Sequence, residues 1–113
     1  MATVAFANGQ NITLAKDFYK HDLKDKGLEE FILVYHNSSS SQAVKSEALF
    51  WIGQISFDQG HFSVAIDDWN KLIELYPESE FAIEINAKLI QLSEVFTSSV
   101  DENISSSLAK SYL

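Results

Sequence analysis

Apolar residues recur at helical spacing between residues 46 and 77, and this stretch sets the pattern for the rest of the chain. Its second half places apolar side chains on one stripe of a helix, at Phe62, Ala65, Ile66, Trp69, Leu72, Ile73 and Tyr76. Its first half, residues 46–58, places them on two faces, as in a helix that neighbours cover on both sides. We expect Gly60 to end the first helix in the left-handed conformation. Pro77 should end the second, because proline lacks an amide hydrogen and its ring clashes with the preceding turn. The pattern therefore predicts a helical hairpin.

Gly53 lies in the middle of the first of these two helices, where glycine is unfavourable. A glycine inside a helix costs ~1 kcal/mol relative to alanine. Either the helix tolerates it, or a neighbouring helix approaches so closely that no side chain fits, and we favour the second interpretation.

Three further amphipathic segments predict three more helices. The first spans residues 11–24, with Asn11 or Thr13 as its N-cap. The second spans residues 28–35 and follows a polar turn at residues 24–27, and the third spans residues 80–96. Residues 37–41, an asparagine and four serines, predict an exposed and mobile loop between hairpins.

The hairpin between residues 46 and 79 resembles a tetratricopeptide repeat, a unit of about 34 residues. The matching positions are Leu49, Ile52, Gly53, Gly60, Ala65, Trp69 and Pro77. Ser56 departs from the family, which usually has tyrosine there, and the adjacent Phe57 is the residue that would compensate. The resemblance implies an all-α fold: an antiparallel helix-hairpin solenoid with a right-handed superhelical twist and about five helices.

A second, degenerate copy of the same pattern precedes this hairpin. A shift of 38 residues aligns Leu14 with Ile52, Ala15 with Gly53, Tyr19 with Phe57, Gly27 with Ala65 and Phe31 with Trp69. Such internal similarity is typical of repeat arrays. We therefore expect a flexible N-terminus at residues 1–10 and a repeat domain at residues 11–113. The domain would comprise repeats at 11–41 and 46–79, a third-repeat or capping helix at 80–96, and a tail at 97–113.

Two short segments bear on the cellular compartment. The run from Leu75 to Ser79, followed by Phe81 and Ala82, resembles the divergent repeats of bacterial cell-envelope proteins, of the Tol-Pal coordinator and outer-membrane assembly lipoprotein types. Residues 5–7, Ala-Phe-Ala, are similar to the end of a secretory signal, although no basic start or long apolar core precedes them. An ordinary flexible terminus is the alternative. We expect a periplasmic or envelope-associated protein, and otherwise a cytoplasmic one.

Composition and charge exclude several classes of function. The 113 residues suffice for one small domain. Asp and Glu number 16 against 8 Lys and Arg, and the net charge of −8 argues against nucleic acid and anionic lipid as partners. No apolar run approaches the ~20 residues of a membrane span, so we expect no membrane insertion. The chain has no cysteine, which removes disulfides and thiolate chemistry.

No catalytic, cofactor-binding or metal-binding motif stands out in the sequence. His21, His36 and His61 lack the spacing of metal ligands and are expected at the surface or in turns. Asp67 and Asp68 are adjacent on a helix and therefore point in different directions, which disfavours a shared carboxylate site. We expect that the chain is not an enzyme and uses no cofactor or metal.

The resemblance implies a ligand groove lined by the first helix of each hairpin. The groove residues that it implies are Lys16, Tyr19, Lys20, Phe50, Trp51, Gln54, Phe57 and Asp58, with Ile12 in the first unit and Ile85, Lys88 and Gln91 in the third. Exposed aromatic side chains in such a groove favour peptide or protein partners. In the alternative, Phe50 and Trp51 pack against the preceding helix or the serine-rich loop.

The expected function is a non-catalytic interaction module or scaffold that presents this groove to a peptide or a partner protein. One alternative is an assembly subunit that forms homo-oligomers through the open end faces of its short array. Another is a recruitment domain that belongs to a larger enzyme.

Overall fold

The structure is a computed structural model that describes residues 9–96. Five α-helices make up most of this range: α1 (Gly9–Lys20), α2 (Lys24–His36), α3 (Gln42–Asp58), α4 (Phe62–Leu75) and α5 (Glu80–Phe96). No strand occurs between residues 9 and 96. The prediction of an all-α fold with about five helices is therefore confirmed.

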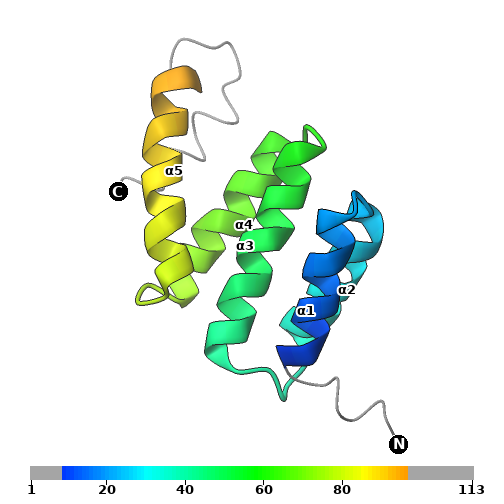
Figure 1. The fold of residues 1–113 in the computed structure, drawn as a ribbon. Helices are drawn as coiled ribbons and strands as arrows, with labels where there is room; N and C mark the ends of the chain where they lie inside the picture. The colour runs from blue at the N-terminus through cyan, green and yellow to red at the C-terminus, as the bar shows by residue number, and fades with distance from the viewer. Residues whose placement is uncertain (1–8, 97–113) are drawn as a thin grey trace, which may run out of the picture.

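The helices are arranged as a row of hairpins with α3 at its centre (Figure 1). Each helix packs against the next one along the chain, and α3 also contacts both α1 and α5. In Figure 1, α1, α3 and α5 face the viewer, whereas α2 and α4 lie behind them. This order places one helix from each hairpin on a common face. The superhelical twist of a tetratricopeptide solenoid stays a prediction.

The ring of Trp69 holds α3 and α4 together and is fully buried. It lies directly over Gly53, where a Cβ atom would sit 2.5 Å from Cδ1 and 2.8 Å from Cε2 of the ring. The indole Nε1 donates a hydrogen bond to the backbone oxygen of Phe50 at 3.1 Å. The predicted close approach at Gly53 is confirmed, because the indole occupies the space that a side chain would need.

The predicted ends of α3 and α4 also agree with the structure. Gly60 has a φ angle of +85°, in the left-handed region, and follows α3. Its amide donates to the carbonyl oxygen of Phe57 at 3.0 Å, and the amide of His61 donates to Ser56 at 2.8 Å. The second helix of the hairpin ends at Leu75, two residues before Pro77.

The first hairpin differs from the prediction at its turn. Residues 24–27 were expected to form a polar turn or tight junction, but they belong to the first turn of α2. The chain reverses at residues 21–23 instead, where Asp22 takes a φ angle of 62° that aspartate tolerates better than most residues. Gly27 is buried against α1, and a Cβ atom there would lie 3.3 Å from the carbonyl oxygen of Ala15. The helix before the turn begins at Gly9, ahead of the predicted caps at Asn11 and Thr13.

The serine-rich connection between the hairpins is more closely packed than its composition indicated. Ser40, expected to be exposed, is buried, and its hydroxyl donates to the backbone oxygen of Val34 at 2.8 Å. The hydroxyl of Ser41 accepts from the amide of Val44 at 3.2 Å and caps α3, which therefore begins at Gln42.

Candidate functional site

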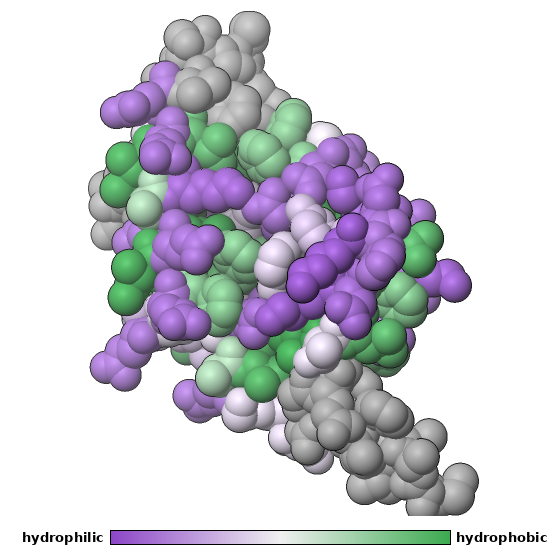
Figure 2. All heavy atoms as spheres, in the orientation of Figure 1, coloured by the Kyte–Doolittle hydropathy of each residue, from purple (hydrophilic) through white to green (hydrophobic). Residues whose placement is uncertain are grey.

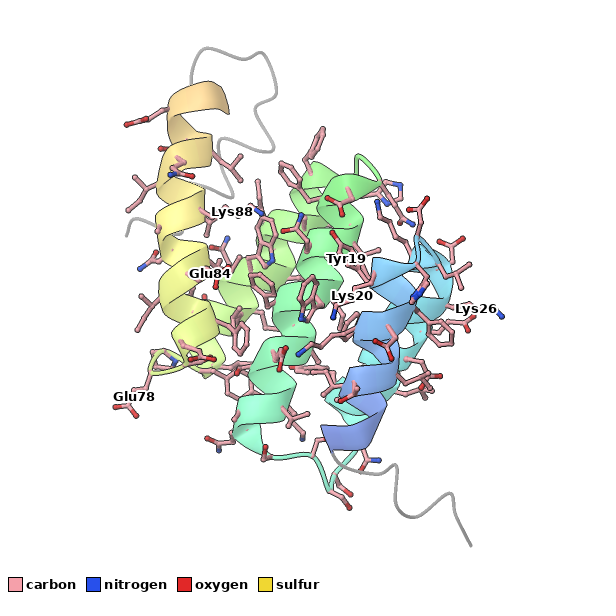
Figure 3. All side chains as sticks on the ribbon, in the orientation of Figure 1. Tyr19, Lys20, Lys26, Glu78, Glu84 and Lys88 are labelled. Carbon is pink, nitrogen blue, oxygen red and sulfur yellow. The ribbon has the colours of Figure 1, made fainter. Side chains whose placement is uncertain are left out.

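The common face of α1, α3 and α5 carries most of the residues predicted to line a groove. We call it the α1–α3–α5 surface. It comprises Lys16, Tyr19, Lys20, Glu47, Trp51, Gln54, Phe57, Asp58, Glu84 and Lys88. Figure 2 shows hydrophilic side chains gathered over α1 and α3 on this face, with hydrophobic atoms visible between α3 and α5. Figure 3 shows Tyr19 and Lys20 on α1 and Glu84 and Lys88 on α5, on opposite sides of α3.

Glu47 joins α1 to α3 near one end of the surface. Its Oε2 atom accepts from the Lys16 ammonium at 2.9 Å and from the Trp51 indole Nε1 at 3.2 Å. The carboxylate is mostly buried, whereas the lysine remains partly exposed, with a side-chain accessibility of 18% against 37%. Two donors on one partly desolvated carboxylate hold the Trp51 ring in a single orientation.

A second set of hydrogen bonds crosses all three helices. The Tyr19 hydroxyl donates to Asp58 at 2.6 Å, and the Gln54 amide donates to the other oxygen of Asp58 at 2.9 Å. Lys88 donates to the side-chain oxygen of Gln54 at 2.6 Å. Lys24 adds an ion pair to Asp58 at 3.7 Å. The surface is thus a connected polar network rather than a set of independent side chains.

The Tyr19 phenol shows how this network affects ionisation. Burial raises the pKa of Tyr19 to about 12, and the hydrogen bond and negative charge of Asp58 act in the same direction. The phenol therefore stays protonated and remains a donor to Asp58 throughout the physiological pH range.

The aromatic residues form the floor of the surface and are less exposed than the groove prediction required. Phe50 is only 8% exposed and packs on Phe81 with ring centroids 5.4 Å apart. Trp51 is half-buried and contacts the rings of Tyr19, Phe31 and Phe50. The alternative, in which both rings pack against the preceding helix or the serine loop, describes Trp51, whose ring contacts Phe31 of α2. It does not describe the contact between Phe50 and Phe81, because Phe81 belongs to the later helix α5. Phe50 is removed from the candidate contact surface.

Phe57 completes this floor on the α5 side. Its ring stacks on Trp69 with centroids 5.7 Å apart and contacts Phe62 at 4.9 Å. The Lys88 ammonium lies 5.2 Å from the Trp69 centroid and 5.8 Å from that of Phe57, within the range of a cation–π interaction. Lys88 thus spans from α5 to the aromatic floor.

Two further residues that were predicted to line the groove, Ile12 and Ile85, belong to the core. Ile12 is 5% exposed and Ile85 is fully buried, so neither is available to a ligand. Gln91 and Lys20 are exposed, as the prediction required. The side chains of Lys20 and Glu84 make no hydrogen bond or ion pair with other residues in the described range, and they carry the unpaired charges of the α1–α3–α5 surface.

Glu47 and Glu84 belong to this surface but were not predicted from the sequence, and neither was Lys24 of α2, which pairs with Asp58 at its edge. Glu47 precedes Trp51 by four residues and Glu84 precedes Lys88 by four, a spacing that places each pair on one helix face. That spacing was the available signal. Lys24 carried no comparable signal, because its place depends on the turn at Asp22.

No group of three His, Asp or Glu side chains in residues 9–96 comes together as a metal site requires. The three histidines are exposed, as expected. Asp67 is exposed, whereas Asp68 is half-buried, and burial raises the pKa of the Asp68 carboxyl, opposed by the charge of Lys71.

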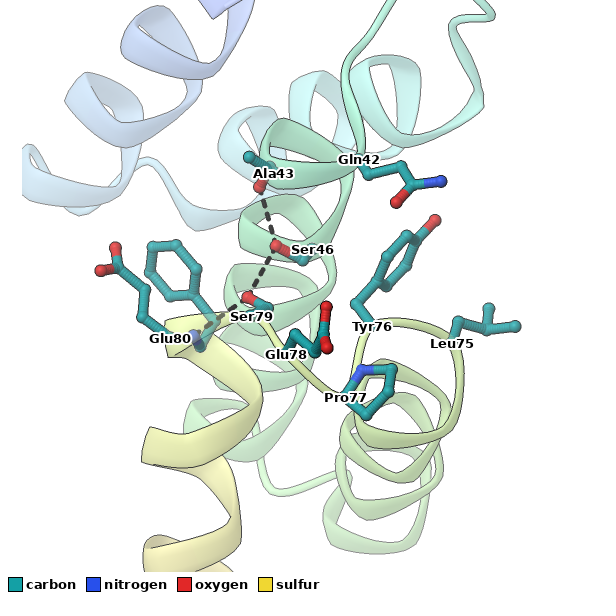
Figure 4. Close-up of a pocket in the computed structure, with 10 residues that line it drawn as sticks. Gln42, Ala43, Ser46, Leu75, Tyr76, Pro77, Glu78, Ser79 and Glu80 are labelled. Atoms are coloured by element: carbon teal, nitrogen blue, oxygen red, sulfur yellow. Dashed lines mark hydrogen bonds between the residues drawn. The ribbon is translucent and has the colours of Figure 1, made fainter.

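A hollow lies outside this surface, between the start of α3 and the loop from α4 to α5 (Figure 4). Its volume is about 590 Å³. Its floor is a chain of hydrogen bonds in which the Phe81 amide donates to Ser79, the Ser79 hydroxyl to Ser46, and the Ser46 hydroxyl to the backbone oxygen of Ala43. These bonds fix the loop to α3.

The outer side of α5 carries a short apolar stripe. Ile83 is 66% exposed and Ile90 is 48% exposed, with the exposed Ala87 between them. Their spacing of four and then three residues places all three side chains on one face of the helix. The opposite face of α5, with Ala82, Ile85 and Leu89, is buried against the other helices.

Comparisons with known proteins add no assignment. No protein-family model matches the chain, and no curated protein or solved structure matches it significantly. None of the helices in residues 9–96 combines the length and apolar character that crossing a membrane requires. The resemblance to tetratricopeptide repeats therefore rests on the residues of this chain alone.

Proposed function

We propose that this protein is a non-catalytic interaction module that holds a peptide segment of a partner protein on the α1–α3–α5 surface. The observation that carries the proposal is the polar network that runs from Tyr19 through Asp58 and Gln54 to Lys88. It joins three helices that are distant in sequence and fixes their outward side chains. A rigid surface loses little conformational entropy when a ligand binds.

The chemistry of the surface favours a peptide over other ligands. Half-buried Tyr19 and Trp51 offer aromatic area to apolar side chains. Lys20 on one side and Glu84 on the other supply unpaired charges of opposite sign. A peptide that carries an acidic and a basic residue with apolar residues between them would match this arrangement.

The proposal is tested by selecting peptides from a random display library against the full chain. The binding site of a selected peptide is then mapped by ¹H–¹⁵N NMR. We expect shift changes to concentrate on α1, α3 and α5 around Gln54 and Lys88. A double charge reversal, Lys20→Glu with Glu84→Lys, should abolish binding of that peptide while the circular dichroism spectrum stays unchanged.

Glu29→Lys provides the matched control, because Glu29 is an exposed charge on α2, away from this surface. It should leave the affinity unchanged. Selected peptides that bind elsewhere on the molecule, or that survive the double reversal, would show that the α1–α3–α5 surface is not the site.

The proposal extends to the compartment through the envelope-type repeat ending at residues 75–79. We propose a periplasmic or envelope-associated protein, and fractionation of cells that produce the chain would test this. The residues that resemble the end of a signal, 5–7, lie outside the described part of the structure.

A second candidate function is homo-oligomerisation, which the apolar stripe of Ile83, Ala87 and Ile90 on α5 favours. Two copies would bury these side chains against each other, although a net charge of −8 on each copy opposes the association. Raising the salt concentration should therefore promote it. Light scattering over a range of protein and salt concentrations distinguishes a monomer from a dimer, and Ile83→Lys should dissolve any dimer formed through this stripe.

A further inference from the structure

The hollow between α3 and the α4–α5 loop is a defined feature that the α1–α3–α5 surface does not use. Its volume of about 590 Å³ falls within the range of small-ligand and side-chain pockets. Its walls come from the first turn of α3, from Leu75 and Tyr76 at the end of α4, and from the loop that begins α5. Two structural elements joined by hydrogen bonds thus form a hollow that is open to solvent.

The polar groups of its floor are already satisfied. Ser79 and Ser46 are linked at 2.9 Å, and each also bonds to backbone: Ser79 accepts from the Phe81 amide, and Ser46 donates to the Ala43 carbonyl. The two hydroxyls therefore serve to hold the loop. A ligand must be recognised by the groups at the rim, namely Gln42, Tyr76 and Glu78.

The groups at the rim favour a positively charged ligand. Figure 4 shows the Glu78 carboxylate turned towards the hollow on the side of Tyr76, whereas the Glu80 side chain points away from it. Glu78 is exposed and makes no hydrogen bond or ion pair with the other described residues. Ser79 already caps the start of α5, so Glu78 is not needed for that purpose. Among residues 9–96, no lysine, arginine or histidine lines the hollow.

A carboxylate beside an aromatic ring suits a planar cation. A guanidinium group pairs with a carboxylate through two parallel hydrogen bonds and stacks on an aromatic face, which an ammonium group does less well. The side-chain oxygen of Gln42 supplies a further acceptor at the rim, and the exposed Leu75 and Pro77 offer apolar area to neighbouring residues. The strongly acidic character of the whole chain adds a long-range attraction for a basic segment.

We propose that this hollow is a second binding site, which takes an arginine side chain flanked by apolar residues from a partner polypeptide. Glu78 pairs with the guanidinium, Tyr76 stacks on it, and Gln42 accepts from it. The site lies at the end of the molecule formed by the α4–α5 loop and does not depend on the peptide proposed for the α1–α3–α5 surface.

The test uses two short probes with ¹⁵N-labelled full-length protein in 150 mM salt, which screens unspecific attraction to the acidic surface. The probes are acetyl-Leu-Arg-Leu-amide and its citrulline counterpart, which has the same shape without the charge. The arginine probe should shift the amide signals of Gln42, Ser79 and their neighbours. The citrulline probe should bind about two- to fivefold more weakly, as the loss of one exposed ion pair implies.

Glu78→Gln should reduce the affinity for the arginine probe by about the same factor, whereas Glu29→Gln removes an equal charge from α2 and should leave it unchanged. Equal binding of both probes, shifts spread over the acidic surface, or full binding by Glu78→Gln would overturn the proposal. Shifts confined to Gln54 and Lys88 would also overturn it, and would place the probe on the α1–α3–α5 surface instead.

Discussion

Replacing Gly53 with alanine tests the packing at the centre of the molecule. Helix propensity alone predicts that the change stabilises α3 by ~1 kcal/mol, because alanine is the better helix former. The structure predicts the opposite sign. The new Cβ atom would lie 2.5 Å from Cδ1 of Trp69, a ring that is fully buried and cannot move into solvent.

The size of the effect follows from two costs. Overpacking a filled core costs about 1–3 kcal/mol. Displacing the ring also breaks the 3.1 Å hydrogen bond from its Nε1 to Phe50, and a buried donor left without a partner costs a further ~1–3 kcal/mol. After subtraction of the gain in helix propensity, these ranges leave a net loss of about 1–5 kcal/mol in the free energy of unfolding, with a central value of about 3 kcal/mol. At the central value of about 3 kcal/mol, the Tm of a domain of this size should fall by roughly 12–24 °C.

Urea and thermal denaturation followed by circular dichroism measure this loss. The control is a double-mutant cycle with Trp69→Phe, whose smaller ring has no indole nitrogen and leaves room for the methyl group. Gly53→Ala should cost less in that background than in the parent chain. A stability of Gly53→Ala equal to or above that of the parent would refute the argument, since helix propensity would then outweigh the contact.

Four further predictions concern single side chains. The pKa of Tyr19 is raised to about 12 in the folded protein, so its contribution to stability is complete below pH 10 and is lost as the pH rises from 10 to 12. Tyr19→Phe should therefore flatten the fall in the free energy of unfolding between these two pH values. Asp58→Asn should lower the pKa of Tyr19, which NMR titration of the ring carbons would detect. Ser41→Ala removes the cap of α3 and should cost ~1 kcal/mol, whereas the exposed Ser38→Ala should cost nothing measurable by urea denaturation. Trp51→Ala should lower the free energy of unfolding by about 2–3 kcal/mol in the same assay, because a half-buried ring with three aromatic neighbours is lost. A loss below about 0.5 kcal/mol would show that the ring contributes as little as a surface residue.

Local chemistry explains the parts of the fold that could be predicted from the sequence. Gly60 ends α3 because few other residues adopt its φ angle of +85° at low cost. Pro77 stops the helix before it because it has no amide hydrogen to donate. The stripe on α4 defined its buried face correctly, since Ala65, Ile66, Trp69 and Leu72 are all buried. Each of these outcomes depends on residues within one or two helical turns.

Tertiary packing decided which apolar residues of α3 face outward. Both faces of this helix are apolar, so periodicity could not show that Phe50 lies beneath Phe81 while Trp51 contacts α1 and α2. The same holds for the position of the first turn, which depends on Asp22 and on the fit of Gly27 against Ala15.

The polar network and the hollow are likewise products of the fold. The partners Lys16 and Glu47, Tyr19 and Asp58, and Gln54 and Lys88 are separated by 31, 39 and 34 residues. Helical periodicity reports which face of one helix a residue occupies, but not which residue of another helix it meets. Local sequence patterns therefore predicted the five helices and the residues that end α3 and α4. Only packing between helices determined the candidate binding surfaces, because their contacts join residues that no local rule connects.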